Sequence, residues 1–494
     1  MPSPLAHDLE QLRLQAEKAA SPGRFAQRIH LMPPVGWLND PNGLCQMTGT
    51  YHAFFQYAPF SAEGGTKMWG HSVSTDMLTW DYVGVPFYPD QPFDVSGVYS
   101  GSALVEDGQM NIFYTGNVKR EDRLDYDYIS SGRESHTVRT TSRDGASFTP
   151  RHVVLSNPDY PHDDTQHVRD PKVWKQHGRY FMALGARRKD DAGEVLIYSS
   201  ADLETWELHD RVSTDEPFGY MWECPDYFEL AADGAAAAAV TAGDGADAAV
   251  LKILSVSPQG LKGGAWDRRN IYQSGYFLLE GSLETHLVPQ DFALWDAGFD
   301  FYAPQTFEAE DGRRILIGWM GVPDETTYTN KTIQDGWQHC FTMPREISVT
   351  DGRVTSWPIR ELESLRTTHV GGREELELSG AHVFDLLVDD FSAKPDTVTI
   401  TCAHELEIGW CNGEFYLRFA DSSMAGVGAG RTERKECVGD IKNVRVIGDT
   451  SSIEVFVNDG VMVFSTRYYP EDYTISVHAP GAAINLWELE RSAG

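Results

Sequence analysis

One phrase occurs twice in this chain, first as Ser74-Thr75-Asp76-Met77-Leu78-Thr79-Trp80 and again as Ser199-Ser200-Ala201-Asp202-Leu203-Glu204-Thr205-Trp206. Each copy follows a run of residues that predicts a β-strand, such as Glu194-Val195-Leu196-Ile197-Tyr198 before the second copy. A strand-and-turn phrase that repeats along a chain indicates repeated sheet units. The repeat therefore predicts a protein assembled from similar antiparallel sheets.

Polar residues in distinctive contexts recur on either side of this phrase, at intervals that suit one sheet each. They are Asp40, Tyr99 with Ser100, Asp170, Glu223 and Tyr302, and the intervals are 59, 71, 53 and 79 residues. Five units of one antiparallel sheet each would form a five-bladed β-propeller. The innermost strands of such a ring would bring these polar side chains together at its axis.

The pattern changes near residue 350, where we expect a second domain. A short helical linker is predicted by Pro358-Ile359-Arg360-Glu361-Leu362-Glu363-Ser364-Leu365. Beyond it, alternating runs at residues 397–400 and 452–457 predict strands, and Asn458-Asp459-Gly460 predicts a hairpin turn. About 125 residues of this pattern favour a β-sandwich.

The first residues predict a short amphipathic helix rather than a signal peptide. Apolar residues recur there at spacings of four and three, with charged residues between them: Leu5, Leu9, Leu12, Ala16 and Ala19. Taken with the strand signals above, the whole chain is expected to be all-β apart from this helix.

We expect an N-terminal helix in residues 1–24, the propeller in 25–350, a linker in 351–368 and the sandwich in 369–494. The Ala-rich residues 231–249 contain interleaved glycines and predict a loose loop inserted between strands.

The composition excludes several classes of partner. Forty-one basic and 73 acidic residues give a formal net charge of −32, which would repel nucleic-acid backbones and anionic lipid. No apolar stretch is long enough to predict a transmembrane helix. The six cysteines show no metal-binding spacing, so we expect a reduced, cytoplasmic protein.

Three acidic motifs are candidates for chemistry. They are Trp37-Leu38-Asn39-Asp40-Pro41-Asn42-Gly43, Arg169-Asp170-Pro171 and Trp222-Glu223-Cys224-Pro225-Asp226. Taken singly, each has a structural interpretation as a tight turn, a surface ion pair or a structural glutamate. Taken together, they supply the nucleophile and proton donor that glycoside cleavage needs, about 5–5.5 Å apart when configuration is retained. Asp226 is expected to place a like charge beside Glu223.

Further motifs accompany these acids in a specific order. They are Phe55-Gln56-Tyr57, Met68-Trp69-Gly70-His71-Ser72-Val73-Ser74, Tyr99-Ser100-Gly101-Ser102, Asp300-Phe301-Tyr302-Ala303 and Thr342-Met343-Pro344-Arg345-Glu346. With them the chain resembles glycoside hydrolase family 32, the β-fructofuranosidases, from about residue 25 through the C-terminal domain. The resemblance implies the same five-bladed propeller and β-sandwich that the strand pattern predicts.

The resemblance also implies roles for individual residues. Asp40 would be the nucleophile, Glu223 the acid and base, and Asp170 the stabiliser of the transition state. The fructose pocket would be lined by Asn39, Gln56, Trp69, Tyr99, Ser100 and Arg169. Similar proteins often carry Phe at the position of Tyr99, so its hydroxyl is a departure that could alter pocket polarity. No metal or cofactor is expected, because carboxylates can stabilise the positive charge that develops on the sugar.

The predicted function is hydrolysis of terminal β-D-fructofuranosides such as sucrose through a covalent fructosyl-enzyme. Sucrose-6-phosphate and short fructo-oligosaccharides stay open as substrates, and the oligomeric state stays open as well. One alternative is a fructosyltransferase that makes fructo-oligosaccharides. Another is a non-catalytic carbohydrate-binding propeller, which the presence of all three acids disfavours.

Weaker signals have simpler interpretations. We interpret His162-Asp163-Asp164-Thr165-Gln166-His167 as a polar loop and Arg187-Arg188-Lys189 as a solvated turn, with contact to a substrate phosphate as the alternative for the latter. Trp319 could be a pocket wall or a core residue. The second domain is expected to pack against the propeller without a binding site of its own.

Overall fold

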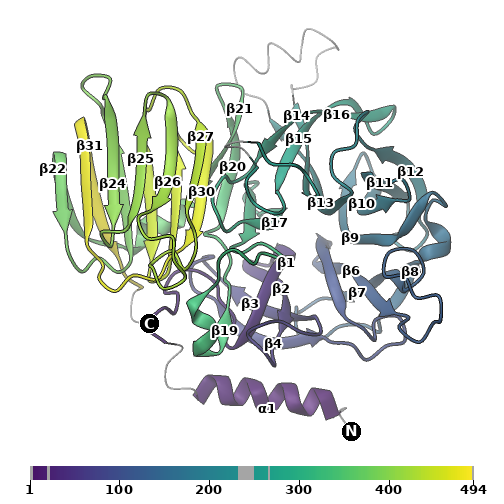
Figure 1. Cartoon of the computed structure of the whole chain (residues 1–494). Coiled ribbons are helices and arrows are strands. Elements are labelled where there is room, and N and C mark those ends of the chain that lie inside the picture. The colour runs from purple at the N-terminus through teal and green to yellow at the C-terminus, as the bar shows by residue number, and fades with distance from the viewer. Residues whose placement is uncertain (1–3, 19–22, 232–249, 265–267, 492–494) are drawn as a thin grey trace.

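The computed structural model describes residues 4–18, 23–231, 250–264 and 268–491, and it contains a ring of sheets beside a second all-β domain (Figure 1). Helix α1 (Pro4–Lys18) lies below the ring and contacts strand β4 (Asp81–Phe87), with Leu9 buried. The prediction of an all-β fold with a five-bladed propeller, a C-terminal β-sandwich and a short N-terminal helix is confirmed. In the described part of the chain, no helix has the length and apolar character needed to cross a bilayer.

Each propeller blade is an antiparallel sheet of four strands whose first strand lies innermost. Blade I consists of β1 (Gly36–Met47), β2 (Thr50–Ala58), β3 (Met68–Ser74) and β4 (Asp81–Phe87). Blade II consists of β5 (Val98–Glu106), β6 (Gln109–Lys119), β7 (Arg133–Ser142) and β8 (His152–Leu155). Blade III consists of β9 (Asp164–Gln176), β10 (Arg179–Arg188), β11 (Gly193–Ser200) and β12 (Glu207–Val212), with the 3-10 helix η1 (Asn157–Asp159) preceding it.

The remaining two blades complete the ring. Blade IV consists of β13 (Met221–Ala231), β14 (Val250–Gln259), β15 (Gly275–Ser282) and β16 (His286–Leu294). Blade V consists of β17 (Tyr302–Glu308), β18 (Arg314–Trp319), β20 (Arg345–Thr350) and β21 (Arg353–Pro358). The five innermost strands contact one another in order and close the ring from β17 to β1. The short strand β19 (Trp337–Gln338), which follows η2 (Lys331–Asp335), pairs with β1 in parallel.

The repeated phrase is a turn between the third and fourth strands of a blade. In blade I, the Ser74 hydroxyl accepts from the backbone N–H of Met77, and the Asp76 carboxylate accepts from the N–H of Leu78. Blade III repeats these bonds with Ser200 and Asp202. Blade II contains a third copy of the turn in residues 142–148, where glycine and phenylalanine replace the hydrophobic residue and the tryptophan of the phrase.

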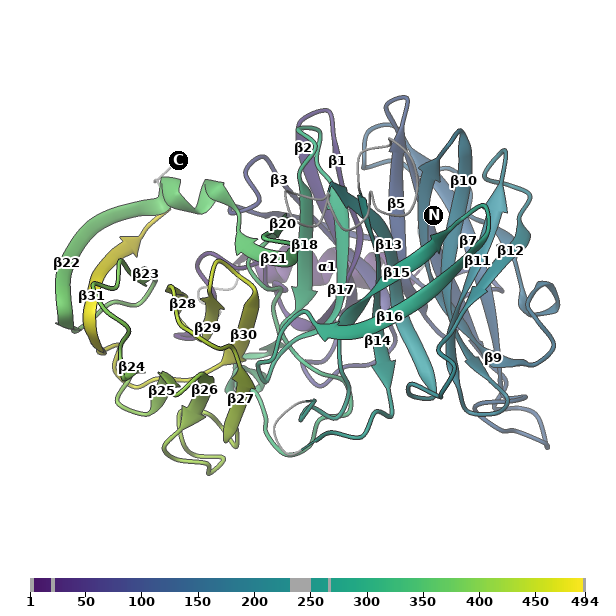
Figure 2. The same cartoon turned by 90° about the horizontal axis from the view of Figure 1, so that it is seen from above.

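The C-terminal domain has two layers that share two long strands. One layer contains β24 (Thr397–Cys402), β25 (Leu406–Cys411), β26 (Glu414–Phe419) and β27 (Glu433–Cys437). The other contains β23 (Phe384–Asp389), β28 (Val444–Asp449), β29 (Ser452–Val457) and β30 (Met462–Arg467). Strand β31 (Ile475–Leu489) pairs first with β24 and then with β23, and β22 (Arg366–Leu378) follows it along its whole length. Both strands curve around the edge of the domain (Figure 2).

The predicted division of the chain at residues 350–369 stays a prediction. Strand β21 extends blade V to Pro358, and the 3-10 helix η3 (Arg360–Leu365) then leads into β22. We therefore propose that the linker is centred on η3. The Ala-rich segment lies outside the described residues except for Ala231, which ends β13.

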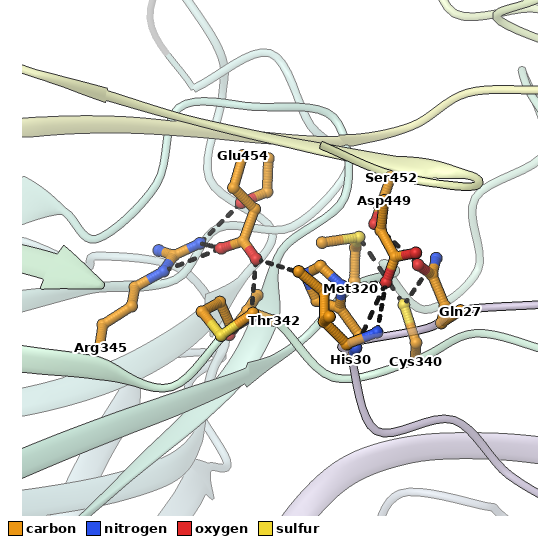
Figure 3. A network of polar contacts seen from close by, with 12 residues as sticks. Gln27, His30, Met320, Cys340, Thr342, Arg345, Asp449, Ser452 and Glu454 are labelled. Carbon is orange, nitrogen blue, oxygen red and sulfur yellow. Dashed lines mark hydrogen bonds and ion pairs between the residues drawn. The ribbon is translucent and has the colours of Figure 1, made fainter. Parts of the chain in front are cut away.

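A buried group of charges joins the two domains (Figure 3). We call His30, Arg345, Asp449 and Glu454 the interface network. His30 Nδ1 lies 2.9 Å from Asp449, its Nε2 lies 2.9 Å from Glu454, and Glu454 also accepts from Arg345 at 2.5 Å. Burial opposes a charged imidazole, but the hydrogen bonds and charges of both acids raise the pKa of His30 to about 9. The propeller and sandwich are therefore held together by paired charges as well as apolar contacts.

Candidate active site

The innermost strand of every blade has a bulge at the same level of the ring. The pairing registers shift at Asn39 and Asp40 in β1, Ser100 in β5, Asp170 and Pro171 in β9, Cys224 and Pro225 in β13, and Ala303 and Pro304 in β17. In three blades the bulge contains a proline, and in blade I Pro41 follows it directly; proline has no N–H to donate to a sheet and is tolerated at such positions. A bulge bends the strand and redirects a side chain. Polar residues that lie in or directly beside these bulges, namely Asp40, Ser100, Asp170, Glu223 and Tyr302, line one cavity.

The backbone is strained at three of these bulges. Asp170 has a φ of 63°, Cys224 a φ of 47° and Ala303 a φ of 47°, which are left-handed conformations that non-glycine residues adopt rarely. Residues held in this way cluster at functional sites, because the surrounding structure must stabilise them. The strain singles out blades III, IV and V at the level of the acids.

An axial cavity of about 490 Å³ opens at this level. Eight of the nine predicted site residues line it: Asn39, Asp40, Gln56, Tyr99, Ser100, Arg169, Asp170 and Glu223. The ninth, Trp69, lies behind the wall, where its fully buried indole donates to the backbone carbonyl of Tyr99 at 3.0 Å. A larger hollow of about 580 Å³ lies between α1 and blade I, but none of the three acids lines it.

Asp40 is held by two side-chain hydrogen bonds. Its Oδ2 accepts from the Ser100 hydroxyl at 2.5 Å, and its Oδ1 accepts from the Asn39 amide at 3.0 Å. The Trp37 indole donates to Asn39 at 2.8 Å and fixes the orientation of that amide. Burial raises the pKa of Asp40, the two hydrogen bonds oppose the increase, and the charge of Glu223 adds to it. Asp40 is thus an oriented carboxyl group whose pKa depends on the charge of Glu223.

Glu223 is bonded at both carboxylate oxygens. Arg169 donates to Oε1 from Nε at 3.1 Å and from Nη2 at 2.5 Å, while Oε2 accepts from Gln259 at 2.8 Å and from the Tyr302 hydroxyl at 2.7 Å. The expectation of a like charge from Asp226 is wrong, because the bulge turns that residue away. Asp226 is fully buried and pairs with Lys172 at 3.2 Å. The nearest charge to Glu223 is therefore a cation.

Asp170 is anchored by the backbone of the neighbouring blade. Its Oδ2 accepts from the Cys224 N–H at 3.0 Å, and its own N–H donates to the Thr115 hydroxyl at 2.9 Å. The Cys224 thiol lies 3.7 Å from Asp170 and 3.9 Å from Asp40, so it stands between the two carboxyl groups. Burial raises the pKa of Asp170, Arg169 opposes this, and Glu223 and Asp40 add to it. The three acids therefore form one electrostatic group.

The cavity also contains residues that the sequence did not identify. They are the polar residues Lys67, Arg133, His167 and Gln259, and the aromatic residues Tyr128, Tyr220 and Tyr272. Trp319 lines the cavity and is also almost fully buried, so it is both wall and core. Alternation along a strand could have revealed His167, because it stands two residues before Arg169. Arg133 had no such signal, since its contacts come from other strands and loops.

Two of the weaker interpretations need correction. His167 belongs to strand β9, which begins at Asp164, so the expected polar loop ends earlier. Arg187 lines the cavity wall, although it also pairs with Asp191 as a solvated residue would. Among the described residues, no group of three or more His, Cys, Asp or Glu side chains is arranged to hold a metal ion.

Comparison with known proteins gives a consistent result. The model of the glycosyl hydrolases family 32 N-terminal domain matches residues 30–358, and that of the family's C-terminal domain matches residues 417–489. The chain is 34% identical over 512 residues to sucrose-6-phosphate hydrolase of Bacillus subtilis (strain 168), covering 98% of this chain and 99% of that protein. It is 36% identical over 482 residues to raffinose invertase of Escherichia coli, covering 94% and 93%. The structure of sucrose-6-phosphate hydrolase from Lactobacillus gasseri matches with a TM-score of 0.83 and 27% identity, covering 98% and 96%.

Proposed function

Because the chain belongs to glycosyl hydrolase family 32 and is therefore a glycosidase, we propose that it is a retaining β-fructofuranosidase acting on terminal β-D-fructofuranosides such as sucrose. The observation that carries this proposal is the convergence of Asp40, Asp170 and Glu223, from three different blades, on one cavity. A cavity of about 490 Å³ lies within the range of small-molecule sites and suits a substrate of disaccharide size.

In the first step, Glu223 donates a proton to the glycosidic oxygen while Asp40 attacks the anomeric carbon of the fructosyl unit. The bond between that carbon and the glycosidic oxygen breaks, and a carboxylate ester to Asp40 forms. The leaving sugar departs with the proton. Ser100 and Asn39 support the attack, because their hydrogen bonds hold the Asp40 carboxylate in one orientation.

In the second step, Glu223 takes a proton from a water molecule that attacks the same carbon. The ester bond breaks, fructose leaves with β configuration, and Asp40 returns as a carboxylate. Tyr302 and Gln259 remain on Oε2 of Glu223 throughout and keep the group aimed at the leaving-group oxygen and then at water. Asp170, fixed by the Cys224 N–H, would accept from fructose hydroxyls and oppose the positive charge on the ring.

The names of the relatives support the substrate class. One is a sucrose-6-phosphate hydrolase and the other a raffinose invertase, and both names concern sugars that end in a fructofuranosyl unit. All six cysteines are free thiols, which supports the proposal that the enzyme works in the reducing cytoplasm.

Methanol trapping tests the proposed mechanism. In aqueous methanol, the fructosyl-enzyme should react with methanol as well as water and yield methyl β-fructofuranoside from sucrose. Formation of the α anomer alone would contradict retention.

At high sucrose concentration, free fructose should be the main product, and abundant trisaccharide with little fructose would favour a transferase instead. No release of sugar from any fructofuranoside would contradict the function itself.

A further inference from the structure

The cations that line the axial cavity are not equally compensated. Arg169 pairs with Glu223 at 2.5 Å, and Arg187 pairs with Asp191 at 2.6 Å. Within the described residues, the other two, Arg133 and Lys67, have no carboxylate at ion-pair distance, although both lie in the wall. A buried charge without a counter-ion is unfavourable unless a ligand supplies one. The uncompensated cations therefore indicate where an anionic group could bind.

Arg133 is the more completely buried of these two cations, with 3% of its surface exposed. Its Nε and Nη2 donate to the Asn117 amide oxygen at 3.2 and 2.7 Å, and its Nη1 donates to Nδ1 of His167 at 2.9 Å. The ring centres of Tyr128 and Tyr99 lie 4.9 and 5.7 Å from the guanidinium carbon. All of these partners are neutral, so they fix the guanidinium without cancelling its charge.

His167 keeps the two arginines of this wall together. Its Nδ1 accepts from Arg133 at 2.9 Å and from Arg169 at 2.8 Å, while its Nε2 lies 3.2 Å from the Tyr128 carbonyl and donates to it. Burial lowers the pKa of His167 to about 2, and the charges of both arginines add to the decrease. The imidazole is therefore a neutral acceptor in one tautomer, and it links Arg133 through Arg169 to Glu223.

This chain of contacts places Arg133 on the side of the proton donor. Under the proposed function, Glu223 faces the glycosidic oxygen, so the sugar that leaves lies on its side of the cavity. Lys67 belongs to the opposite end, because its ammonium lies 4.7 Å from the Trp37 ring centre and its charge acts on Asp40. We propose that Arg133 is the anchor of an anion subsite that binds a phosphate group on the leaving sugar.

The chemistry of the group suits this ligand. A guanidinium offers several N–H groups in a planar fork, which matches the oxygens of a phosphate. The chain as a whole has a net charge of −32 and repels anions, so a phosphorylated substrate needs a local cation at the point of binding. The inference rests on the proposed function and specifies its substrate as sucrose with a phosphomonoester on the glucose unit.

The test compares kcat/KM for sucrose and sucrose-6-phosphate in the wild-type enzyme and in Arg133→Gln. The wild type should prefer the phosphorylated substrate, and R133Q should reduce that preference about 10- to 100-fold, the range expected for loss of a charged hydrogen bond. Arg133→Lys should retain part of the preference. Equal losses on both substrates, or no loss on either, would overturn the anion subsite.

Two further variants control this result. Arg139→Gln changes the same residue type on the same strand, outside the cavity and paired with Glu204, and it should leave both kcat/KM values unchanged. Arg187→Gln tests the competing cation of the cavity wall. If R187Q, and not R133Q, removes the preference for the phosphorylated substrate, Arg133 is not the anchor.

Product binding to the wild-type enzyme tests the anion subsite without any variant. Glucose 6-phosphate should compete with substrate at a concentration at least about tenfold lower than glucose, and inorganic phosphate should compete with glucose 6-phosphate. Equal binding of glucose and glucose 6-phosphate would contradict the anion subsite alone. If the wild type hydrolyses neither substrate, the proposed function fails, and calorimetry of glucose 6-phosphate with wild type and R133Q still decides whether the anion subsite exists.

Discussion

The interface network and the axial cavity both contain buried charges, but the two regions differ in how completely these charges are paired. In the interface network, the side chains of His30, Arg345, Asp449 and Glu454 are fully buried, and every carboxylate contacts a cation. In the axial cavity, the side chains that bond Asp40 within the described part of the chain are neutral donors, and Asp170 lies 3.9 Å from the guanidinium that bonds Glu223. Complete pairing at the interface and incomplete pairing in the cavity suit different tasks.

The carboxyl groups of the two regions show what the difference does. Burial is the largest influence on all of them and by itself raises a carboxyl pKa. The pKa of Asp449 and Glu454 is nevertheless lowered, because His30 and Arg345 stabilise the charged forms. The pKa of Asp40 and Asp170 is raised, since like charges from the other acids add to burial. Burial alone therefore does not decide the charge state; the partner does.

The largest expected effect is the loss of turnover when a cavity acid is neutralised. Asp40→Asn removes the proposed nucleophile and should lower kcat on sucrose by at least about 10,000-fold. Glu223→Gln should lower it by about 100- to 10,000-fold, because proton transfer to the leaving oxygen is lost. The free energy of unfolding of D40N should stay unchanged or rise, since burial disfavours the carboxylate that is removed. Steady-state kinetics and denaturant titration of each variant measure both quantities.

A substrate with an activated leaving group separates the two roles. An aryl β-fructofuranoside needs little protonation, so the first step should recover in E223Q and stay blocked in D40N. A fast release of aryl alcohol by D40N, or near-normal sucrose hydrolysis by either variant, would contradict the assigned roles.

The interface network should respond in the opposite way. Glu454→Gln leaves Arg345 and the charged His30 without a shared counter-ion, and breaking a buried pair in this way costs about 3–5 kcal/mol of unfolding free energy. kcat/KM at a temperature where the variant is folded should not change. The control is Glu407→Gln, which breaks a partly exposed pair with Arg418 and should cost no more than about 1 kcal/mol. Equal stability of E454Q and E407Q would show that the network does not hold the domains together.

The free energy of unfolding should depend on pH because of His30. Its pKa is about 9 in the folded protein against an ordinary value of 6.5, so its contribution is complete below pH 6.5 and is lost as the pH rises through 9. A difference of this size corresponds to about 3 kcal/mol of unfolding free energy between pH 6.5 and 9. Urea titrations across this range should show the decrease in the wild type. The same decrease in His30→Gln would assign it to another group.

The two regions also differ in what the sequence could reveal. Repetition at blade-sized intervals indicated the propeller, and the acids stood in local motifs that also mark the bulges through Asp40-Pro41, Asp170-Pro171 and Cys224-Pro225. A local phrase can be found without knowing the fold. The third copy of the turn was missed because Gly145 and Phe148 replace the residues that made the other two copies similar.

Contacts between distant residues left no such trace. His30 and Glu454 are 424 residues apart, and no pattern near either one indicates that they meet. Arg133 and His167 likewise contact each other only because β7 and β9 lie side by side in the fold. The wrong expectation for Asp226 has the same origin, because its buried pairing with Lys172 of blade III is a contact between residues that are distant in the sequence.

The smallest expected effects come from removing the hydroxyl group of one of two buried tyrosines, which deletes a single hydrogen bond in each variant. The Tyr302 hydroxyl donates to Glu223 at 2.7 Å in the cavity, and the buried Tyr328 hydroxyl donates to the carbonyl of Phe299 near the sandwich. Tyr302→Phe should lower kcat/KM about tenfold, since one hydrogen bond to a charged group is lost, with little change in unfolding free energy. Tyr328→Phe should lower unfolding free energy by about 1 kcal/mol and leave kcat/KM unchanged. If both variants lose activity and stability in the same proportion, the cavity and the region around Tyr328 form one cooperative unit, and activity and stability do not depend on separate parts of the molecule.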